Sequence, residues 1–164
     1  MKFFFLLALS ILAIAGACTE RPSSGTLSGR MVKVADGDTF TLLTESKDQF
    51  RIRLNGIDAP EKGQDFYRVA KDRLSRLLAG RTVRIKSNGK DKYGRIIADV
   101  YLEDNRWVNL DLVNNGLAWH FKKYSANSQL HAAEQAARSA RIGIWSQPNP
   151  IAPWEFRSRK KLNQ

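Results

Sequence analysis

The chain has 164 residues, a length that suits one domain with a substantial core and is short for two. Apolar residues make up 43% of it and charged residues 26%, a balance that excludes a wholly disordered chain. The net charge of +11 and the pI near 10.1 favour polyanionic partners, first nucleic acid and then anionic membrane surfaces. From charge alone, a basic surface with no specific partner is an equally good interpretation.

The N-terminus has the pattern of an export signal. Lys2 provides a positive start, and residues 3–15 are apolar apart from one serine. This run is too short to span a bilayer comfortably, and Ala15 and Ala17 fit the A-x-A pattern of a cleavage site. We therefore predict a signal peptide over residues 1–17 and an exported protein, either periplasmic or extracellular.

Cys18 is the only cysteine and follows this segment directly. A single cysteine forms no internal disulfide, so the fold must depend on its core. The sequence Ala-Gly-Ala-Cys resembles a bacterial lipobox, although Ala15 stands where leucine is usual. We favour lipidation of Cys18, and with it a membrane anchor, over a spare thiol. Residues 18–29 are rich in Ser, Gly and Thr and predict a flexible tether before a domain over residues 30–147.

Short strands dominate the first half of this domain. Residues 31–34 and 39–43 flank Asp36-Gly37, a dipeptide typical of a tight hairpin. Apolar and polar residues alternate over 50–54, so one face of this strand is directed to a core and the other is polar. The further β-branched runs are residues 82–86 and 96–102.

Helices are predicted between these strands and after them. The first ends at Gly80 and has an apolar face formed by Phe66, Val69, Ala70, Leu74, Leu77 and Leu78. The others cover residues 108–115 and 130–140. These elements predict an α+β fold, a five-stranded OB-type β-barrel with about three helices, an architecture that commonly binds oligonucleotides. Pro148, Pro150 and Pro153 predict no regular helix in the basic C-terminal extension, residues 148–164.

Acidic residues occur in two segments of the predicted barrel. Asp36 and Asp38 lie on the first hairpin, and Asp58 and Glu61 follow the next strand. Each segment alone has a simpler interpretation, as a hairpin turn or as the acidic start of a helix. The intervening strands run antiparallel, so the hairpin brings the segments together, where their carboxylates would repel unless a cation lies between them. Calcium and magnesium are the natural occupants of such an all-oxygen site.

Arginines near these acids could bind a phosphate. Arg51 and Arg53 both lie on the polar face of their strand, so alternation does not choose between them, and Arg95 lies at a later turn. An arginine fork binds phosphate oxygens bidentately and stabilises charge that builds in a transition state. Singly, each arginine is better interpreted as surface charge in a basic protein. His120 and His131 are remote in sequence, which disfavours zinc and favours structural or surface roles for both.

In chain order, residues 36–39, 53–61 and 91–95 resemble the motifs of the staphylococcal nuclease (thermonuclease) family. The resemblance extends from about residue 30 to residue 145, which is nearly the whole predicted domain. It implies a calcium-dependent phosphodiesterase, an endonuclease that hydrolyses DNA and RNA and leaves 3′-phosphate ends. It also implies a preference for single-stranded or frayed nucleic acid, and nothing in the sequence suggests more than a monomer.

The same resemblance implies roles for individual residues. Asp38 and Asp58 would bind calcium through their carboxylates, and Ala59 through its backbone carbonyl. Glu61 would orient or deprotonate the attacking water. The arginines that bind the scissile phosphate would be Arg53 and Arg95, rather than Arg51.

Further positions would support the ion or contact the nucleotide. Asp36 would hold the calcium-binding residues in position without binding the ion itself. Lys92 and Tyr93 fall at nucleotide-binding positions, and Tyr124 resembles a tyrosine that packs beside the base and sugar. Lys122 also falls at a nucleotide-binding position, but the best-known member of the family has a second tyrosine there, so base preference is expected to differ.

Functions of other classes fit parts of the same sequence. The main alternative is a non-catalytic OB-fold lipoprotein that binds nucleic acid or another polyanion. A further alternative is a surface lipoprotein whose basic face binds anionic lipid or polysaccharide. Calcium-dependent loss of DNA that stops with a chelator would separate the enzyme from both.

Overall fold

The computed structural model describes residues 26–162. The predicted signal peptide, Cys18 and residues 19–25 of the predicted tether lie outside the described residues. Within the described part of the chain, no helix is long and apolar enough to cross a membrane.

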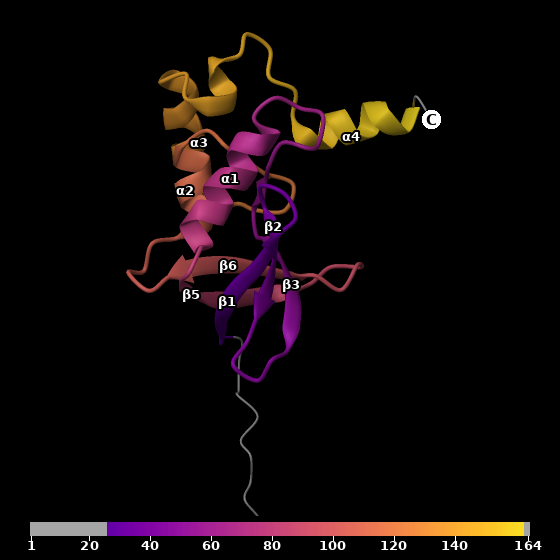
Figure 1. Cartoon of the computed structure of the whole chain (residues 1–164). Coiled ribbons are helices and arrows are strands. Elements are labelled where there is room, and N and C mark those ends of the chain that lie inside the picture. The colour runs from indigo at the N-terminus through magenta and orange to yellow at the C-terminus, as the bar shows by residue number, and fades with distance from the viewer. Residues whose placement is uncertain (1–25, 163–164) are drawn as a thin grey trace, which may run out of the picture.

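Within residues 26–162, five strands close into a mixed β-barrel in the order β1-β2-β3-β6-β5 (Figure 1). Neighbouring strands are antiparallel except for β3 and β6, which run parallel. The strands are β1 (Thr26–Val34), β2 (Thr39–Leu43), β3 (Gln49–Leu54), β5 (Thr82–Lys90) and β6 (Ile96–Leu102). The predicted five-stranded OB-type barrel is therefore confirmed.

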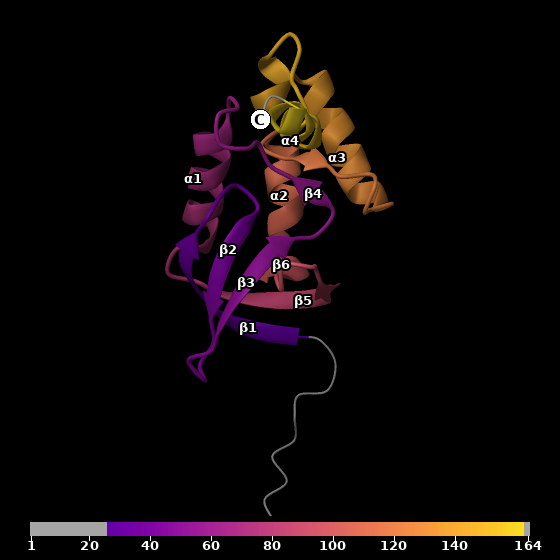
Figure 2. The ribbon, with the colours of Figure 1, turned by 90° about the vertical axis from the view of Figure 1, so that its right-hand side faces the viewer.

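Four helices and a small second sheet complete the α+β fold of the described residues. The helices are α1 (Tyr67–Leu78), α2 (Val108–Asn114), α3 (Ser128–Ser139) and α4 (Pro153–Leu162), with a 3₁₀ turn η1 (Gly143–Ser146). Strands β4 (Ile57–Asp58) and β7 (Trp119–His120) pair antiparallel outside the barrel. Helices α1, α2 and α3 lie over one end of the barrel, and α4 lies at the far end of this helical layer, close to β4 (Figure 2).

The core is shared by the barrel interior and the helices above it. Phe40, Leu54 and Val100 from the strands pack in one cluster with Leu74 of α1 and Leu112 of α2. A second buried cluster lies beneath α3, η1 and α4; its members are Trp119, Ala137, Ile144, Trp145 and Ala152. This second cluster fixes the C-terminal segment against β7.

The predicted tether extends too far, because β1 already begins at Thr26. Serine and glycine give the segment around Gly29 the composition of a linker. Gly29 is nevertheless buried, and a Cβ atom there would collide with the carbonyl oxygen of Leu43 on β2. This glycine therefore permits close strand packing and does not indicate flexibility.

The prediction that the C-terminal extension contains no regular helix is wrong. Helix α4 begins at Pro153, and proline suits the first helical position because the N–H that it lacks would have no intrahelical partner there.

The prediction that Val69 lies on the buried face of the first helix is also wrong. Val69 is 46% exposed, because it lies about a quarter of a turn away from the buried stripe of α1 that contains Ala70 and Leu74.

Candidate active site

The hairpin between β1 and β2 packs tightly against the segment that follows β4. Gly37 is buried there, and a Cβ on it would lie 2.7 Å from the Cβ of Ala59 and 2.8 Å from that of Ala70 on α1. Gly37 does not have a positive φ, so the glycine is required for this close approach and not for the turn itself. As a result, Asp38 Oδ2 accepts a 2.6 Å hydrogen bond from the backbone N–H of Ala59.

Arg53 of β3 joins the two acidic segments. Its Nη1 lies 3.1 Å from Asp38 Oδ2, and its Nη2 donates to Asp58 Oδ1 at 2.8 Å. Nη1 also donates to the backbone carbonyls of Leu54 and Ile57 at 3.0 and 2.9 Å, which holds the guanidinium in place. The structure thus brings Asp38, Asp58 and Arg53 together, whereas Arg51 is exposed on the barrel surface.

Two acids of this region, Asp36 and Asp58, have surroundings that disfavour their charged form. Asp36 Oδ1 accepts a hydrogen bond of 3.1 Å from the backbone N–H of Asp38. Burial, together with the neighbouring charge of Asp38, raises the pKa of Asp36 to about 6. The side chain of Asp58 is only 1% exposed, and burial raises its pKa against the opposing hydrogen bond from Arg157. Such a cluster needs positive charge nearby to keep its carboxylates ionised.

Arg157 of α4 supplies part of that charge, although the sequence did not predict it. Its Nη2 donates to Asp58 Oδ2 at 2.8 Å, and its Nη1 donates to Asp58 Oδ1 at 3.2 Å. Nη1 also donates to Glu61 Oε1 at 2.5 Å. Asp58 therefore lies between two guanidinium groups, and Glu61 joins the cluster through Arg157.

Arg95 lies at the turn between β5 and β6. Its Nε donates to Asp91 Oδ2 at 2.7 Å, while Asp91 Oδ1 accepts from the backbone N–H groups of Tyr93 and Arg95. Slight burial acts to raise the pKa of Asp91, but the hydrogen bonds from Arg95 and Tyr93 outweigh it and lower that pKa. Ile52 pairs in parallel register with Ile96, so Arg95, one residue before β6, lies level with Arg51. Among the described residues, the ion pair of Arg95 is with Asp91 and not with Asp38 or Asp58.

The predicted nucleotide-binding residues fall into two groups. On the turn after β5, Lys92 Nζ lies 5.1 Å from the ring centroid of the exposed Tyr93. After β7, the exposed Tyr124 packs edge-on against Phe121 with ring centroids 4.8 Å apart. Lys122 Nζ lies 3.2 Å from Glu134 Oε2, so this lysine is held to a buried acid.

Two carboxylates of the cluster suit a hard cation. Among residues 26–162, no three His, Cys, Asp or Glu side chains gather closely enough to hold a metal ion by themselves. Calcium, however, takes about six to eight oxygen ligands and commonly completes them with backbone carbonyls and water. Asp38 and Asp58 fit part of such a set, and the backbone N–H of Ala59 holds the carboxylate of Asp38 in place. Two guanidinium groups occupy the oxygens of Asp58, so a cation that binds there must displace or share these contacts.

The OB-type barrel and this cluster of acids and arginines define a protein suited to bind a phosphodiester. The family model described as staphylococcal nuclease homologue matches residues 51–147. A Haemophilus influenzae protein named "uncharacterized endonuclease" is 37% identical over 162 residues, which cover 99% of this chain and 88% of that protein. An Escherichia coli protein of the same name is 38% identical over 160 residues, which cover 98% of this chain and 100% of that protein. A micrococcal nuclease of Shigella flexneri is 33% identical over 150 residues, which cover 85% of this chain and 86% of that protein. The chain belongs to the family of staphylococcal nuclease homologues.

Sequence reasoning missed the contribution of α4. Arg157 lies in a basic run, residues 157–161, in which nothing distinguishes it from Arg159 or the lysines. Trp154, near the start of α4, was a better indication that this segment is folded, because a tryptophan side chain usually buries much of its surface against the rest of the protein. Trp154 packs edge-on against Trp119, with ring centroids 5.5 Å apart.

Proposed function

We propose that the protein is a metal-dependent nuclease: a calcium-dependent endonuclease that hydrolyses DNA and RNA and leaves 3′-phosphate ends. The observation that carries this proposal is the cluster in which Arg53 joins Asp38 to Asp58, in a chain of a nuclease family. Relatives named endonuclease and micrococcal nuclease support the same activity.

In this proposal Asp38, Asp58 and the backbone carbonyl of Ala59 hold the calcium ion. When bound, the ion offsets negative charge on the scissile phosphate. Asp36 keeps the Asp38 loop in position, since it accepts a hydrogen bond from the backbone N–H of Asp38. The close contact of Gly37 with Ala59 has the same effect, because it fixes the two acidic segments against each other.

Glu61 and two arginines carry out the chemistry. Arg157 engages Oε1 of Glu61, and the other carboxylate oxygen is the proposed acceptor of a proton from the attacking water. Arg53 and Arg95 bind phosphate oxygens as negative charge builds on them. Removal of one such donor typically lowers the rate by about a hundredfold to a thousandfold.

Substrate contacts favour single-stranded or frayed nucleic acid. The arginines contact only the phosphate, which DNA and RNA share. Tyr93 and Tyr124 are exposed, with Lys92 and Lys123 beside their rings, and an exposed aromatic ring can stack on any unpaired base. Lys122, in place of a second stacking tyrosine, adds charge to this surface. The proposed enzyme acts as a monomer.

The proposal is tested with purified protein on plasmid and on single-stranded DNA and RNA, in calcium, in magnesium or in a chelator. We expect calcium-dependent internal cleavage and products that carry 3′-phosphates by mass spectrometry. Asp58→Asn should abolish cleavage, whereas the matched control Asp104→Asn, which removes an exposed carboxylate, should not. Tight binding of nucleic acid without cleavage in any metal would instead support the non-catalytic binding module.

We further propose that the protein is exported and anchored through lipidated Cys18. This proposal rests on the apolar segment of residues 3–15 and on the Ala-Gly-Ala-Cys sequence that follows it. Mass spectrometry of the mature N-terminus tests it. A lipidated cysteine as the first residue is the expected result, and an unmodified thiol at position 18 would refute the anchor.

A further inference from the structure

Strands β1 and β5 pair along one side of the barrel and carry charge of one sign. Together they contain five lysines and arginines and no acidic residue. The five are Arg30, Lys33, Arg84, Lys86 and Lys90, and all of them are exposed. None of these five cations belongs to the acid cluster, and the proposed chemistry uses none of them. The motifs for the ion and the phosphate therefore do not account for this charge.

The register of these strands gathers three of the cations at the end of the barrel where β1 begins. Lys86 is the partner of Thr26, the first residue of β1, and Arg84 is the partner of Ser28. Arg84 and Lys86 are exposed and the residue between them is buried, so both side chains leave the outer surface of the barrel. Arg30 lies on the same surface, two residues after Ser28. We call the surface formed by Arg30, Arg84 and Lys86 the basic end of the barrel.

Two acidic residues border the basic end. Asp99 of β6 is the register partner of Lys86 and accepts a hydrogen bond of 2.9 Å from Asn88. Glu103, directly after β6, lines a small hollow beside Arg84. These two acids are fewer than the five cations of β1 and β5, so this side of the barrel keeps a net positive charge.

Aromatic rings also border the basic end. The guanidinium of Arg84 lies 5.0 Å from the ring centroid of Tyr101 on β6. Tyr101 in turn stacks on Trp107, with ring centroids 6.3 Å apart, and both side chains are half-buried. Tyrosine and tryptophan rings with one apolar and one wet edge favour the boundary between lipid headgroups and hydrocarbon. The basic end therefore combines cations with the aromatic side chains that suit a membrane surface.

The basic end is the part of the domain nearest in the chain to the proposed anchor. Eight residues lead from Cys18 to Thr26, and even a fully extended chain of that length spans only about 26–29 Å. Lipidation of Cys18 would thus hold the start of β1 within about 30 Å of the bilayer. A tether limits this distance without selecting the surface that faces the membrane. The charge of the basic end can make that selection.

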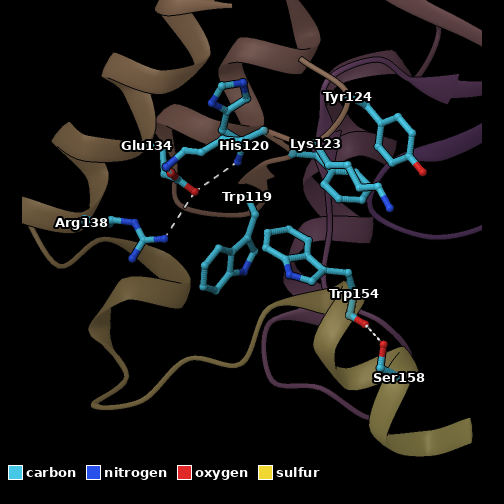
Figure 3. Close-up of a pocket in the computed structure, with 10 residues that line it drawn as sticks. Trp119, His120, Lys123, Tyr124, Glu134, Arg138, Trp154 and Ser158 are labelled. Carbon is cyan, nitrogen blue, oxygen red and sulfur yellow. Dashed lines mark hydrogen bonds and ion pairs between the residues drawn. The ribbon is translucent and has the colours of Figure 1, made fainter. Parts of the chain in front are cut away.

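The proposed nucleic-acid contacts lie at the other end of the molecule. Asp38 comes after the last residue of β1, and both views place α4 far from the start of this strand (Figures 1 and 2). Lys123 and Tyr124 line a cavity beside α4 (Figure 3). Strand β1 has nine residues, so its two ends are about 26 Å apart along the strand. A membrane in contact with the basic end therefore leaves the acid cluster directed toward solution.

We propose that the basic end binds the surface of an anionic phospholipid bilayer and so orients the anchored domain with its acid cluster away from the membrane. This inference rests on the proposed anchor at Cys18 and is independent of the proposed nuclease activity. Each lysine or arginine held near an anionic bilayer strengthens binding by about fivefold, within a screening distance of about 8–10 Å. Nucleic acid, which the anionic surface repels, then reaches the acid cluster from the solution side.

The first test measures binding to vesicles by sedimentation, at fixed salt and with chelator present. The protein is the mature chain from residue 18 with Cys18→Ser, which carries no lipid, so binding depends on the folded domain. We expect binding to vesicles of mixed phosphatidylglycerol and phosphatidylcholine and little binding to phosphatidylcholine alone. Arg30→Glu combined with Lys86→Glu should weaken binding to the mixed vesicles at least about tenfold.

Arg159→Glu combined with Lys160→Glu is the matched control. This pair also replaces one arginine and one lysine, both of them exposed, but on α4 at the other end of the molecule. It should weaken vesicle binding by less than about threefold, because charges far from the surface are screened. Equal losses in the two pairs would reduce vesicle binding to net charge and overturn the oriented surface.

The second test measures orientation with an environment-sensitive fluorophore on a single thiol. Cys18 is the only cysteine, so the Cys18→Ser chain accepts the label at Ser28→Cys on β1 or at Ser158→Cys on α4, two exposed serines. We expect anionic vesicles to shift the emission to shorter wavelength at position 28 and to leave it unchanged at position 158. A shift at position 158, or none at position 28, would refute the orientation. Circular dichroism verifies that each variant is folded.

A third measurement separates lipid from nucleic acid as the partner of the basic end. The affinity for a labelled single strand of DNA, with chelator present, should be no lower in the Arg30→Glu, Lys86→Glu protein than in the α4 control. A larger loss at the basic end would assign this surface to nucleic acid and overturn the proposal. An unmodified Cys18 with intact vesicle binding refutes only the anchor, whereas a lipidated Cys18 with equal losses in the two pairs refutes only the oriented surface.

Discussion

Arg157 and a calcium ion would compete for the same carboxylates. Arg157 donates to both oxygens of Asp58 and to Glu61, so an ion that binds Asp58 must displace or share these contacts. Removal of the guanidinium leaves Asp58 with one cationic partner, Arg53. We therefore expect Arg157→Ala to bind calcium more tightly than the unmodified protein.

The size of this effect follows from the contacts. A hydrogen bond to a charged group contributes about 1.5–3 kcal/mol when it is protected from water. The side chain of Arg157 is 39% exposed, so solvent screening reduces its competition with calcium to about 1–2 kcal/mol. This free energy corresponds to a dissociation constant for calcium that is roughly 5- to 30-fold lower in the variant.

Isothermal titration with calcium, in the absence of nucleic acid, measures the difference directly. Arg159→Ala is the matched control, because Arg159 is an exposed residue of the same helix and its loss changes the net charge equally. The control should shift the dissociation constant by less than about twofold, since exposed charges are largely screened. Unchanged or weaker calcium binding in Arg157→Ala, or an equal gain in both variants, would refute competition at Asp58.

Three further substitutions test other parts of the site. Glu61→Gln should lower kcat at least about a hundredfold while circular dichroism is unchanged, and full turnover would exclude Glu61 as the base. Gly37→Ala places a Cβ 2.7 Å from Ala59 and 2.8 Å from Ala70, so the free energy of unfolding in urea should fall by about 1–3 kcal/mol; an unchanged midpoint would contradict this packing. Burial lowers the pKa of His120, so this side chain takes up a proton at higher pH in the unfolded chain than in the folded one. The free energy of unfolding therefore decreases as pH falls below 6.5. The titratable groups that face His120 are Glu134, Lys122 and His131. His120→Gln should reduce the shift in urea midpoint between neutral and mildly acidic pH, and an equal shift would exclude His120 as its source.

The barrel was predictable because its strands alternate between core and surface. Along β6, Ile96, Ala98, Val100 and Leu102 are buried and the residues between them are partly exposed, which is the period of two that the sequence displays. The beginning of β1 was not predictable from composition, since Gly29 serves close packing in a segment that resembles a linker. Helix α4 escaped prediction for a related reason: proline is excluded from helix interiors but is favoured at their first position.

The acid cluster was predictable where it depends on local topology. Asp38 and Asp58 come together because a hairpin folds their segments onto each other, and Arg53 lies on the intervening strand. Arg157 lies 99 residues beyond Asp58 in the sequence, so its contact depends on how α4 docks. No local pattern encodes that docking, because it depends on tryptophan packing between α4 and β7.

Helix α4 therefore connects the tryptophan packing on β7 to the acid cluster. Trp154 and Arg157 are three positions apart, which places them on neighbouring parts of one helix surface, one against Trp119 of β7 and one on the acids. If a bound strand draws Arg157 from Asp58, calcium must bind more tightly in its presence, and by linkage calcium must strengthen binding of the strand by the same factor. Arg157→Ala removes this contact, so the mutual effect of strand and calcium should be smaller in that variant, and only the direct attraction between the ion and the phosphate should remain.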